Sequence, residues 1–258
     1  MTATAIYPTL KGRVAIVTGS GQGLGRSFVQ HFAEQGAIPV IAERNSEAAT
    51  ALQKELEAQG HRALAVRTDV SDPDSVAELV GRTLAAFGRI DVLINNAAML
   101  QDLTIGPFWE LPLDEWRRVI DVSVTGTFLC SRAVVPAMQK GQWGRIVNLS
   151  STNLISGKPN YLHYTASKSA LIGMTRALAR ELGRWNITVN VLLPGTTKTE
   201  VSRTSAEDDY FERALRQQSM QRLAEVSDHA RVLLFLCSDD AGFISGQSLL
   251  CDGGRHFN

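Results

Sequence analysis

Short runs of apolar, mostly β-branched residues alternate along the chain with longer stretches in which apolar residues recur at helical spacing. The short runs predict buried strands over residues 14–18, 38–42, 63–66, 92–95, 145–149 and 188–193. The longer stretches predict helices over about 25–35, 46–59, 72–87, 113–138 and 164–182. Asp72 and Pro73 form a good cap and first-turn pair for the third of these helices. Continuous apolar strands that alternate with helices predict a parallel sheet covered on both faces.

One region departs from this alternation of strands and helices. Residues 196–221 are mostly polar, with a helical pattern near 210–216. Ligands of such sheets bind beyond the carboxyl ends of the strands, so this stretch is interpreted as an insertion that covers the substrate. No Pro/Ser-rich linker, block of charge or internal repeat divides the chain, which predicts one domain over residues 1–258.

Composition narrows the class of protein. The 258 residues are 44% hydrophobic and 20% charged, as in a globular protein. Equal numbers of basic and acidic residues, 26 of each, argue against nucleic acid as a partner, because such binding needs a basic excess. The chain begins without a signal-peptide pattern, and no apolar run approaches the roughly 18 residues of a membrane span. We expect a protein without a membrane anchor.

The cysteines and histidines predict neither disulfides nor a metal site. Cys130, Cys237 and Cys251 are odd in number and far apart, and they form no C-x-x-C pair. The five histidines have no ligand spacing. A cytoplasmic protein without a bound metal is therefore expected.

A glycine-rich turn follows the first strand, over residues 18–25. Glycines there allow a tight turn and a close approach to a pyrophosphate at a helix N-terminus, although a plain flexible turn has the same composition. The fingerprint G-x-G-x-x-G fits in no frame, and a Walker A loop fails because Arg26 replaces its lysine. The pattern T-G-x-x-x-G-x-G does fit, through Thr18, Gly19, Gly23 and Gly25. It is the cofactor motif of the short-chain dehydrogenase/reductase family, which the chain resembles over about residues 11–254.

The resemblance implies a fold and a set of cofactor residues. The fold would be α/β, a single doubly wound (Rossmann) domain with a seven-stranded parallel sheet flanked by helices on both faces. The residues placed at the cofactor are Gly19, Gln22, Gly23, Leu24, Gly25, Asp69, Val70, Asn96, Ala97, Tyr164, Lys168, Pro194, Gly195, Thr197 and Thr199. The Thr197 backbone and Thr199 hydroxyl would hold the nicotinamide carboxamide. Two residues depart from the family pattern: Ala98 replaces a glycine, and Thr197 stands where an aliphatic residue is commoner.

The end of the second strand bears on the choice of dinucleotide. Glu43 lies twenty residues after Gly23, where a carboxylate can accept the ribose hydroxyls of NAD and repel a 2′-phosphate. Arg44 beside it favours the phosphate of NADP, whereas Gln22 stands where NADP-using relatives often carry a basic residue. Glu43 also suits a solvated strand end. The balance predicts NAD, with NADP as the alternative.

Three residues form a candidate catalytic group. Tyr164 and Lys168 are four apart and so share one helix face, and Ser151 lies thirteen residues before the tyrosine, the family's usual separation. A tyrosine is a weak base at neutral pH, and the adjacent ammonium favours its phenolate. Tyr164 would then exchange a proton with the alcohol, while Ser151 stabilises the developing alkoxide and Lys168 holds the nicotinamide ribose.

The resemblance implies a fourth catalytic residue, an asparagine in a helix motif like N-x-x-G that relays protons through water. Ser123 stands at this position, in Ser123-Val124-Thr125-Gly126. Serine also bonds water and helix carbonyls, so a preserved relay is expected.

The substrate itself is beyond the sequence. Asn153, His163 and Arg203, with Ser151 and Tyr164, lie where relatives border their substrate. Polar side chains there suggest a polar or anionic small molecule, with a solvated loop as the alternative. For His163, simple packing is an equal alternative.

Taken together, these residues predict a NAD-preferring oxidoreductase that transfers hydride between nicotinamide and a secondary alcohol or sugar hemiacetal. An NADPH-dependent 3-oxoacyl reductase and a non-catalytic dinucleotide-sensing protein are the alternatives. Helices apolar on more than one face, with a C-terminal tail that resembles the family's interface segment, predict a homotetramer, with a dimer as second choice.

Overall fold

A computed structural model describes residues 5–101, 103–201 and 210–257. Seven parallel strands form one sheet in the order β3-β2-β1-β4-β5-β6-β7. The strands are β1 (Val14–Thr18), β2 (Ile38–Glu43), β3 (Leu64–Arg67), β4 (Val92–Asn95), β5 (Gly144–Leu149), β6 (Ile187–Pro194) and β7 (Ser248–Cys251). The sheet confirms the predicted parallel arrangement.

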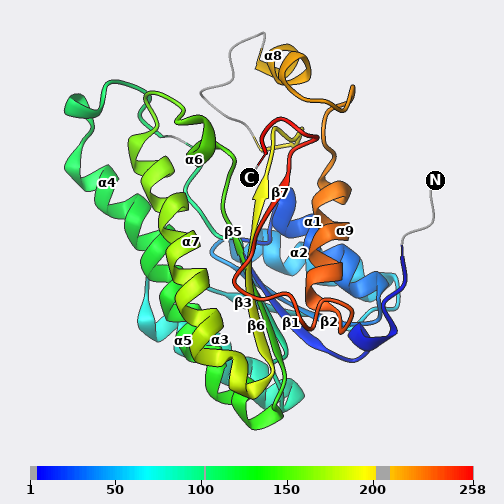
Figure 1. Cartoon of the computed structure of the whole chain (residues 1–258). Helices are drawn as coiled ribbons and strands as arrows, with labels where there is room; N and C mark the ends of the chain where they lie inside the picture. The colour runs from blue at the N-terminus through cyan, green and yellow to red at the C-terminus, as the bar shows by residue number, and fades with distance from the viewer. Residues whose placement is uncertain (1–4, 102, 202–209, 258) are drawn as a thin grey trace.

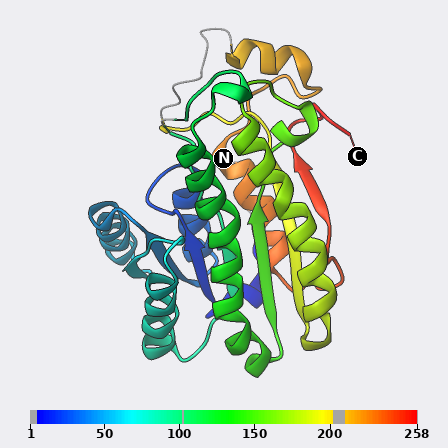
Figure 2. The ribbon, with the colours of Figure 1, turned by 90° about the vertical axis from the view of Figure 1, so that its left-hand side faces the viewer.

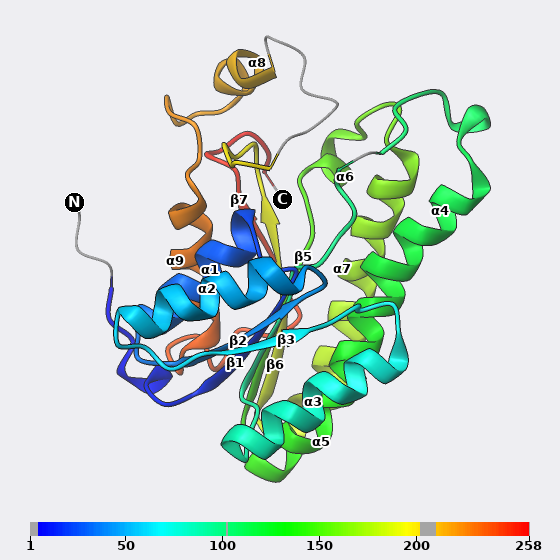
Figure 3. The same ribbon diagram turned by 180° about the vertical axis from the view of Figure 1, so that it is seen from behind.

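Helices cover both faces of the sheet (Figures 1 and 3). One face carries α1 (Gly23–Glu34), α2 (Ser46–Ala58) and α9 (Val226–Cys237), and the other carries α3 (Pro73–Phe87), α5 (Gly126–Gly141) and α7 (Leu162–Leu182). Strand β1 shows how one sequence serves two cores: Ala15 and Val17 pack toward the first set of helices, and Val14 and Ile16 toward the second. The fold is therefore doubly wound, as expected.

Local sequence signals explain where these helices begin. The Asp72 side chain accepts the Asp74 N–H at 3.0 Å, and Pro73 occupies the first turn of α3. Asn45 caps α2 in the same way, through the N–H groups of Glu47 and Ala48. The remaining elements are short: η1 (Pro8–Leu10), η2 (Phe108–Glu110), η4 (Gly183–Trp185), α6 (Asn153–Ser156) and α8 (Tyr210–Gln217).

The helix predicted over 113–138 is one continuous helix from Leu113 to Gly141 with a defect in its middle. Helices α4 (Leu113–Ile120) and α5 are joined by a π-helical turn, η3 (Asp121–Thr125). By length and composition alone this 29-residue helix could cross a membrane, yet 44% of its most apolar window is buried inside the fold. The core helices of soluble proteins pass the same test, so its length and composition assign no membrane span.

The sheet topology places the site. Strands β1 and β4 are neighbours, and the chain winds outward from them in opposite directions. The carboxyl ends of strands at such a switch point form a crevice in which ligands bind. The segments that leave β1, β4, β5 and β6 all start at this edge, which places the glycine-rich turn beside the residues that follow each of the other three strands.

Candidate active site

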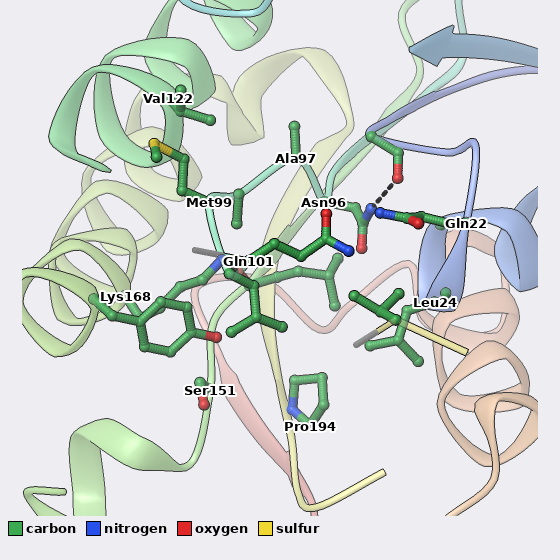
Figure 4. Close-up of a pocket in the computed structure, with 18 of the residues that line it drawn as sticks. Gln22, Leu24, Asn96, Ala97, Met99, Gln101, Val122, Ser151, Lys168 and Pro194 are labelled. Carbon is green, nitrogen blue, oxygen red and sulfur yellow. Dashed lines mark hydrogen bonds between the residues drawn. The ribbon is translucent and has the colours of Figure 1, made fainter. Parts of the chain in front are cut away.

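A cavity of about 880 Å³ opens at the carboxyl ends of the central strands. Figure 4 shows Gln22 and Leu24 at one end of it and Ser151 and Lys168 at the other. Nearly all of the residues singled out in the sequence line it, namely Gly19, Gln22, Gly23, Leu24, Gly25, Glu43, Arg44, Asp69, Val70, Asn96, Ala97, Ser151, Asn153, Tyr164, Lys168, Pro194, Gly195, Thr197 and Thr199. Its size lies within the range of small-molecule and cofactor sites.

The glycine-rich turn is packed so tightly that side chains would not fit. Gly19 has φ +61°, and a Cβ there would lie 2.8 Å from the Ala97 Cα atom. A Cβ on Gly25 would lie 2.3 Å from the Gly19 carbonyl oxygen and 2.6 Å from the Asn96 side-chain nitrogen. The two glycines thus let α1 start directly against the turn and against the segment after β4.

Asn96 fastens that segment to the turn. Its side-chain amide donates to the carbonyl oxygens of Thr18 and Gly19, at 2.9 and 2.8 Å. In return, the Thr18 hydroxyl oxygen accepts the backbone N–H groups of Asn96 and Ala97, both at 3.0 Å. The floor of the cavity between β1 and β4 is therefore held by side-chain bonds as well as by the sheet.

The N-terminus of α1 faces the cavity with its first-turn amides. Gln22, at the N-cap, makes no side-chain capping bond, and the first turn contains no acidic residue. The Gly23 N–H instead donates to the Glu200 carboxylate at 2.8 Å, and this bond holds the pKa of Glu200 below its usual range. The chain after β6 therefore reaches across the glycine-rich turn at a point where an anion is favoured.

Acidic groups mark the β2 and β3 end of the cavity. The Glu43 carboxylate accepts the N–H groups of Gly21 at 3.0 Å and Asn45 at 2.9 Å, so it is held beside the turn. The hydroxyl of Ser71 donates to Asp69 at 2.6 Å and lowers the pKa of that carboxyl. Arg44 lines the same end with an exposed side chain.

The opposite end holds the candidate catalytic group. Tyr164 and Lys168 lie one helical turn apart on α7, with the lysine nitrogen 5.8 Å from the centre of the tyrosine ring. Lys168 is only 3% exposed, and its ammonium donates to the Leu149 carbonyl oxygen at 2.7 Å. Burial lowers its pKa to about 8. Ser151, beyond β5, accepts the Asn153 N–H on its hydroxyl oxygen at 3.2 Å.

The loop after β6 brings the third set of residues. The Gly195 N–H donates to the Cys251 carbonyl oxygen at 2.9 Å, and a Cβ on Gly195 would meet the Asp252 Cα atom at 2.6 Å. Thr197 is buried, whereas the Thr199 hydroxyl oxygen accepts the Val201 N–H at 3.3 Å. The loop is thus held against the end of β7.

Ser123 lies in the π-helical turn η3 rather than in the cavity lining. It is 1% exposed, and its hydroxyl has no partner among the described residues. A π-helical turn is an inserted irregularity that often marks functional positions. The helix is thus irregular at this motif, and the proton relay itself stays a prediction.

Of the two roles that the sequence left open for His163, a substrate wall or simple packing, the structure favours packing. His163 is fully buried outside the cavity lining, and its Nε2 atom lies 3.0 Å from the Glu115 carboxylate. Thr104 donates to the same carboxylate through its N–H at 2.7 Å and its hydroxyl at 2.6 Å. Burial alone would raise the pKa of Glu115, but these hydrogen bonds outweigh it and lower the pKa. His163 therefore ties α7 to α4 and to the segment after β4.

The substrate side is only partly as predicted. Asn153 lines the cavity, whereas Arg203 lies outside the described residues. Sequence reasoning missed several lining residues, among them Met99, Leu100, Gln101, Arg118, Asp121 and Val122. The first three follow β4, and the rule that ligands bind beyond strand ends was a signal for them. The other three come from α4 and η3, whose helical periodicity gave no sign that they reach the cavity.

Comparison with known proteins agrees with this geometry. The family profile described as enoyl-(acyl carrier protein) reductase matches residues 19–256. A (2S)-[(R)-hydroxy(phenyl)methyl]succinyl-CoA dehydrogenase subunit of Thauera aromatica is 41% identical over 95% of this chain and 97% of its own. The chain belongs to the short-chain dehydrogenase/reductase family. Like other family members, it is an NAD(P)-dependent oxidoreductase acting on CH–OH groups and carbonyls.

Other family members differ in substrate and cofactor. A 3-oxoacyl-[acyl-carrier-protein] reductase of Staphylococcus epidermidis is 35% identical over 94% of this chain and 98% of its own. A 7α-hydroxysteroid dehydrogenase complexed with NADH has a TM-score of 0.90 at 30% identity, covering 98% of both chains. A blue fluorescent protein from a metagenomic library, complexed with NADPH, has a TM-score of 0.87 at 37% identity, covering 96% of this chain and all (100%) of its own. The family therefore leaves the substrate and the preferred dinucleotide open.

Proposed function

We propose that the protein is a NAD-preferring dehydrogenase that interconverts a secondary alcohol, or a cyclic hemiacetal, and its carbonyl product. The observation that carries this proposal is that one cavity has Glu43 near one end and Ser151, Tyr164 and Lys168 at the other. The first end suits an unphosphorylated adenosine ribose, and the second suits a reacting alcohol.

The residues present fit a dinucleotide. Glycines at 19, 23 and 25 leave backbone room where a Cβ would collide, and the first turn of α1 favours an anion, as the bond of the Gly23 N–H to the Glu200 carboxylate illustrates. We assign Asp69 and Val70 to the adenine, Asn96 and Ala97 to the adjoining ribose region, and Thr197 and Thr199 to the carboxamide. When bound, the nicotinamide supplies the acceptor or donor of the hydride.

The proton chemistry falls to the chain's own side chains. Tyr164 removes the hydroxyl proton of the alcohol as the hydride leaves, and returns it in the reverse direction. The buried ammonium of Lys168 favours the phenolate form, because an opposite charge nearby stabilises it. Ser151 donates a hydrogen bond to the substrate oxygen as negative charge develops on it. Ser123, in the π-helical turn, serves the exchange of that proton with solvent.

We further propose that residues 196–221 cover the substrate and that the substrate is polar or anionic. The bond between Glu200 and Gly23 supports the covering role, since it holds part of residues 196–221 across the edge of the cavity. Asn153 and Gln101 in the lining support the second. A screen of alcohols, sugars and hydroxy acids, followed through NADH absorbance, identifies the substrate class.

The preference for NAD depends on Glu43. Replacing Glu43→Gln removes the charge that repels a 2′-phosphate, so kcat/KM with NADP is expected to rise about tenfold, the effect of roughly 1.4 kcal/mol. Glu47→Gln, which changes an exposed residue four positions further on, is the matched control. It is expected to leave kcat/KM unchanged with NAD and with NADP. Steady-state rates with both cofactors provide the measurement. A wild-type protein that prefers NADP would contradict the proposal.

An NADPH-dependent 3-oxoacyl reductase is the second candidate. Its support is the Staphylococcus epidermidis relative, together with the exposed Arg44 side chain at the adenosine end. Reduction of a 3-oxoacyl thioester by NADPH at a rate above that of any alcohol oxidation with NAD would favour this candidate.

A further inference from the structure

His229 is a buried histidine behind the loop that follows β6. It belongs to the first residues of α9, is 0% exposed and does not line the cavity. Its Nε2 atom lies 2.7 Å from the hydroxyl oxygen of Thr197, which does line the cavity. The two residues are 32 positions apart in the chain, and no motif connects them.

The other hydrogen bonds of Thr197 and His229 show which of the two donates. The Thr197 hydroxyl donates its proton to the Gly195 carbonyl oxygen at 3.0 Å, so its oxygen is left to accept the Nε2–H of His229. The Nδ1 atom of His229 has no partner among the described residues, and an unpartnered lone pair there costs less than a buried, unpaired N–H. His229 is thus neutral and protonated on Nε2. Burial lowers the pKa of His229 to about 4, in keeping with this state.

The bond joins a loop to a rigid support. Next to His229, Ala230 and Leu233 of α9 pack in the core together with Phe28 of α1. The backbone of the loop is held by the Gly195 N–H, which donates to Cys251, and by a parallel bridge between Thr197 and Ala224, in which the Lys198 N–H donates to Ala224 at 3.4 Å. The histidine adds a side-chain anchor at Thr197, which ties the loop to α9.

We propose that His229 is a positioning residue for the nicotinamide end of the cofactor. It acts through Thr197, fixing the backbone of the loop that the proposed function assigns to the carboxamide, and the inference rests on that assignment. Thr197 and His229 are both buried, and the Nε2–H of His229 has Thr197 as its acceptor, so the two side chains act as a pair. Loss of Thr197 strands the buried Nε2–H of His229, and loss of His229 leaves Thr197 bonded only to its own loop, at Gly195; loss of both leaves an apolar contact.

A four-protein comparison tests this coupling: the wild type, Thr197→Val, His229→Leu and the double variant. Dissociation constants for NADH are measured by fluorescence titration, and those for ADP-ribose by competition. Each single variant is expected to bind NADH about tenfold more weakly, and the double variant within about threefold of the wild type. ADP-ribose lacks the nicotinamide, so its affinity is expected to stay within about twofold throughout, which a general loss of structure would not allow.

His229→Gln is the conservative variant, because its amide can still donate to Thr197, and it is expected to keep the wild-type affinity for NADH. Single variants that bind NADH as the wild type does, or a double variant whose loss is the product of the single losses, would overturn the inference. Parallel losses of ADP-ribose affinity would overturn it as well. A wild type that binds neither NADH nor ADP-ribose would instead refute the proposed function, and the inference with it.

Discussion

The buried ammonium of Lys168 lowers the stability of the folded protein. The ammonium is buried and donates a hydrogen bond to the Leu149 carbonyl oxygen, and burial lowers its pKa from 10.5 to about 8. The unfolded chain therefore binds more protons than the folded protein between these pH values. The free energy of unfolding therefore decreases as the pH falls from 10.5 to 8. Below pH 8 the decrease stays at about 3 kcal/mol, because each pKa unit corresponds to roughly 1.4 kcal/mol.

This balance gives a prediction. Lys168→Met is expected to abolish oxidoreductase activity and to raise the free energy of unfolding at pH 7 by about 1 to 3 kcal/mol, because an apolar side chain avoids the desolvation. Urea unfolding at pH 7 and at pH 10.5 measures it, and the gain is expected to shrink at the higher pH. A variant that is less stable than the wild type at pH 7 would contradict this account of Lys168.

Single residues could be predicted where a local spacing carries the chemistry. Tyr164 and Lys168 are four apart on a helix, and Gly19 and Gly25 flank one turn, so their proximity follows from the backbone. His163 is the opposite case. Its partner Glu115 lies 48 residues earlier in the chain, and only the packing of α4 against α7 brings them together. The contact between Thr197 and His229 could not be predicted from the sequence for the same reason.

At the level of elements, the π-helical turn η3, which contains Ser123, joins helices α4 and α5. The hydroxyl of Ser123 is buried without a partner among the described residues, as expected of a group that bonds a water. Serine and asparagine can both do so. If the relay works through Ser123, Ser123→Asn is expected to change kcat by less than about threefold. If the relay of the wild type were impaired, the same substitution would raise kcat about tenfold or more. A tenfold gain in kcat would show that the relay is impaired in this chain.

The regular elements were predictable, and the connections between them were not. Strand β4 (Val92–Asn95) has the bounds that its apolar run predicts, and α3 begins where Asp72 and Pro73 indicate. In contrast, the short helix α6 and the segment between β4 and η2 have no periodicity, and their conformation depends on tertiary bonds such as that of Thr104 to Glu115. These segments include lining residues of the cavity, so the substrate end was the least predictable part of the site.

At the scale of the whole molecule, helices α5 and α7 lie side by side along one flank (Figure 2). Phe128 on α5 is 49% exposed and Leu162 at the start of α7 is 46% exposed. Apolar side chains on the outer face of core helices are typical of surfaces that pack against a second copy. This observation supports the homotetramer that the sequence predicts.

The assembly can be tested directly. Phe128→Glu is expected to lower the molar mass of the particle from that of a tetramer to that of a dimer or monomer, because a charge would be buried in the interface. Ile6→Glu, which changes an exposed apolar residue near the N-terminus, away from α5, α7 and the C-terminal tail, is the matched control. Light scattering after size-exclusion chromatography measures both. A wild-type monomer, or an unchanged mass for Phe128→Glu, would contradict the proposal.

The central claim is that Tyr164 exchanges the proton of a substrate alcohol while hydride passes to or from nicotinamide. Its most direct test compares Tyr164→Phe with Tyr161→Phe, in the rate of NADH formation with the best alcohol of the screen. Tyr161 packs against Tyr164 with ring centres 6.5 Å apart, and its hydroxyl has no partner among the described residues. The account predicts a loss in kcat/KM of about 1,000-fold for Tyr164→Phe with NADH binding retained, and less than about twofold for Tyr161→Phe. Activity of Tyr164→Phe within about threefold of the wild type would contradict the claim.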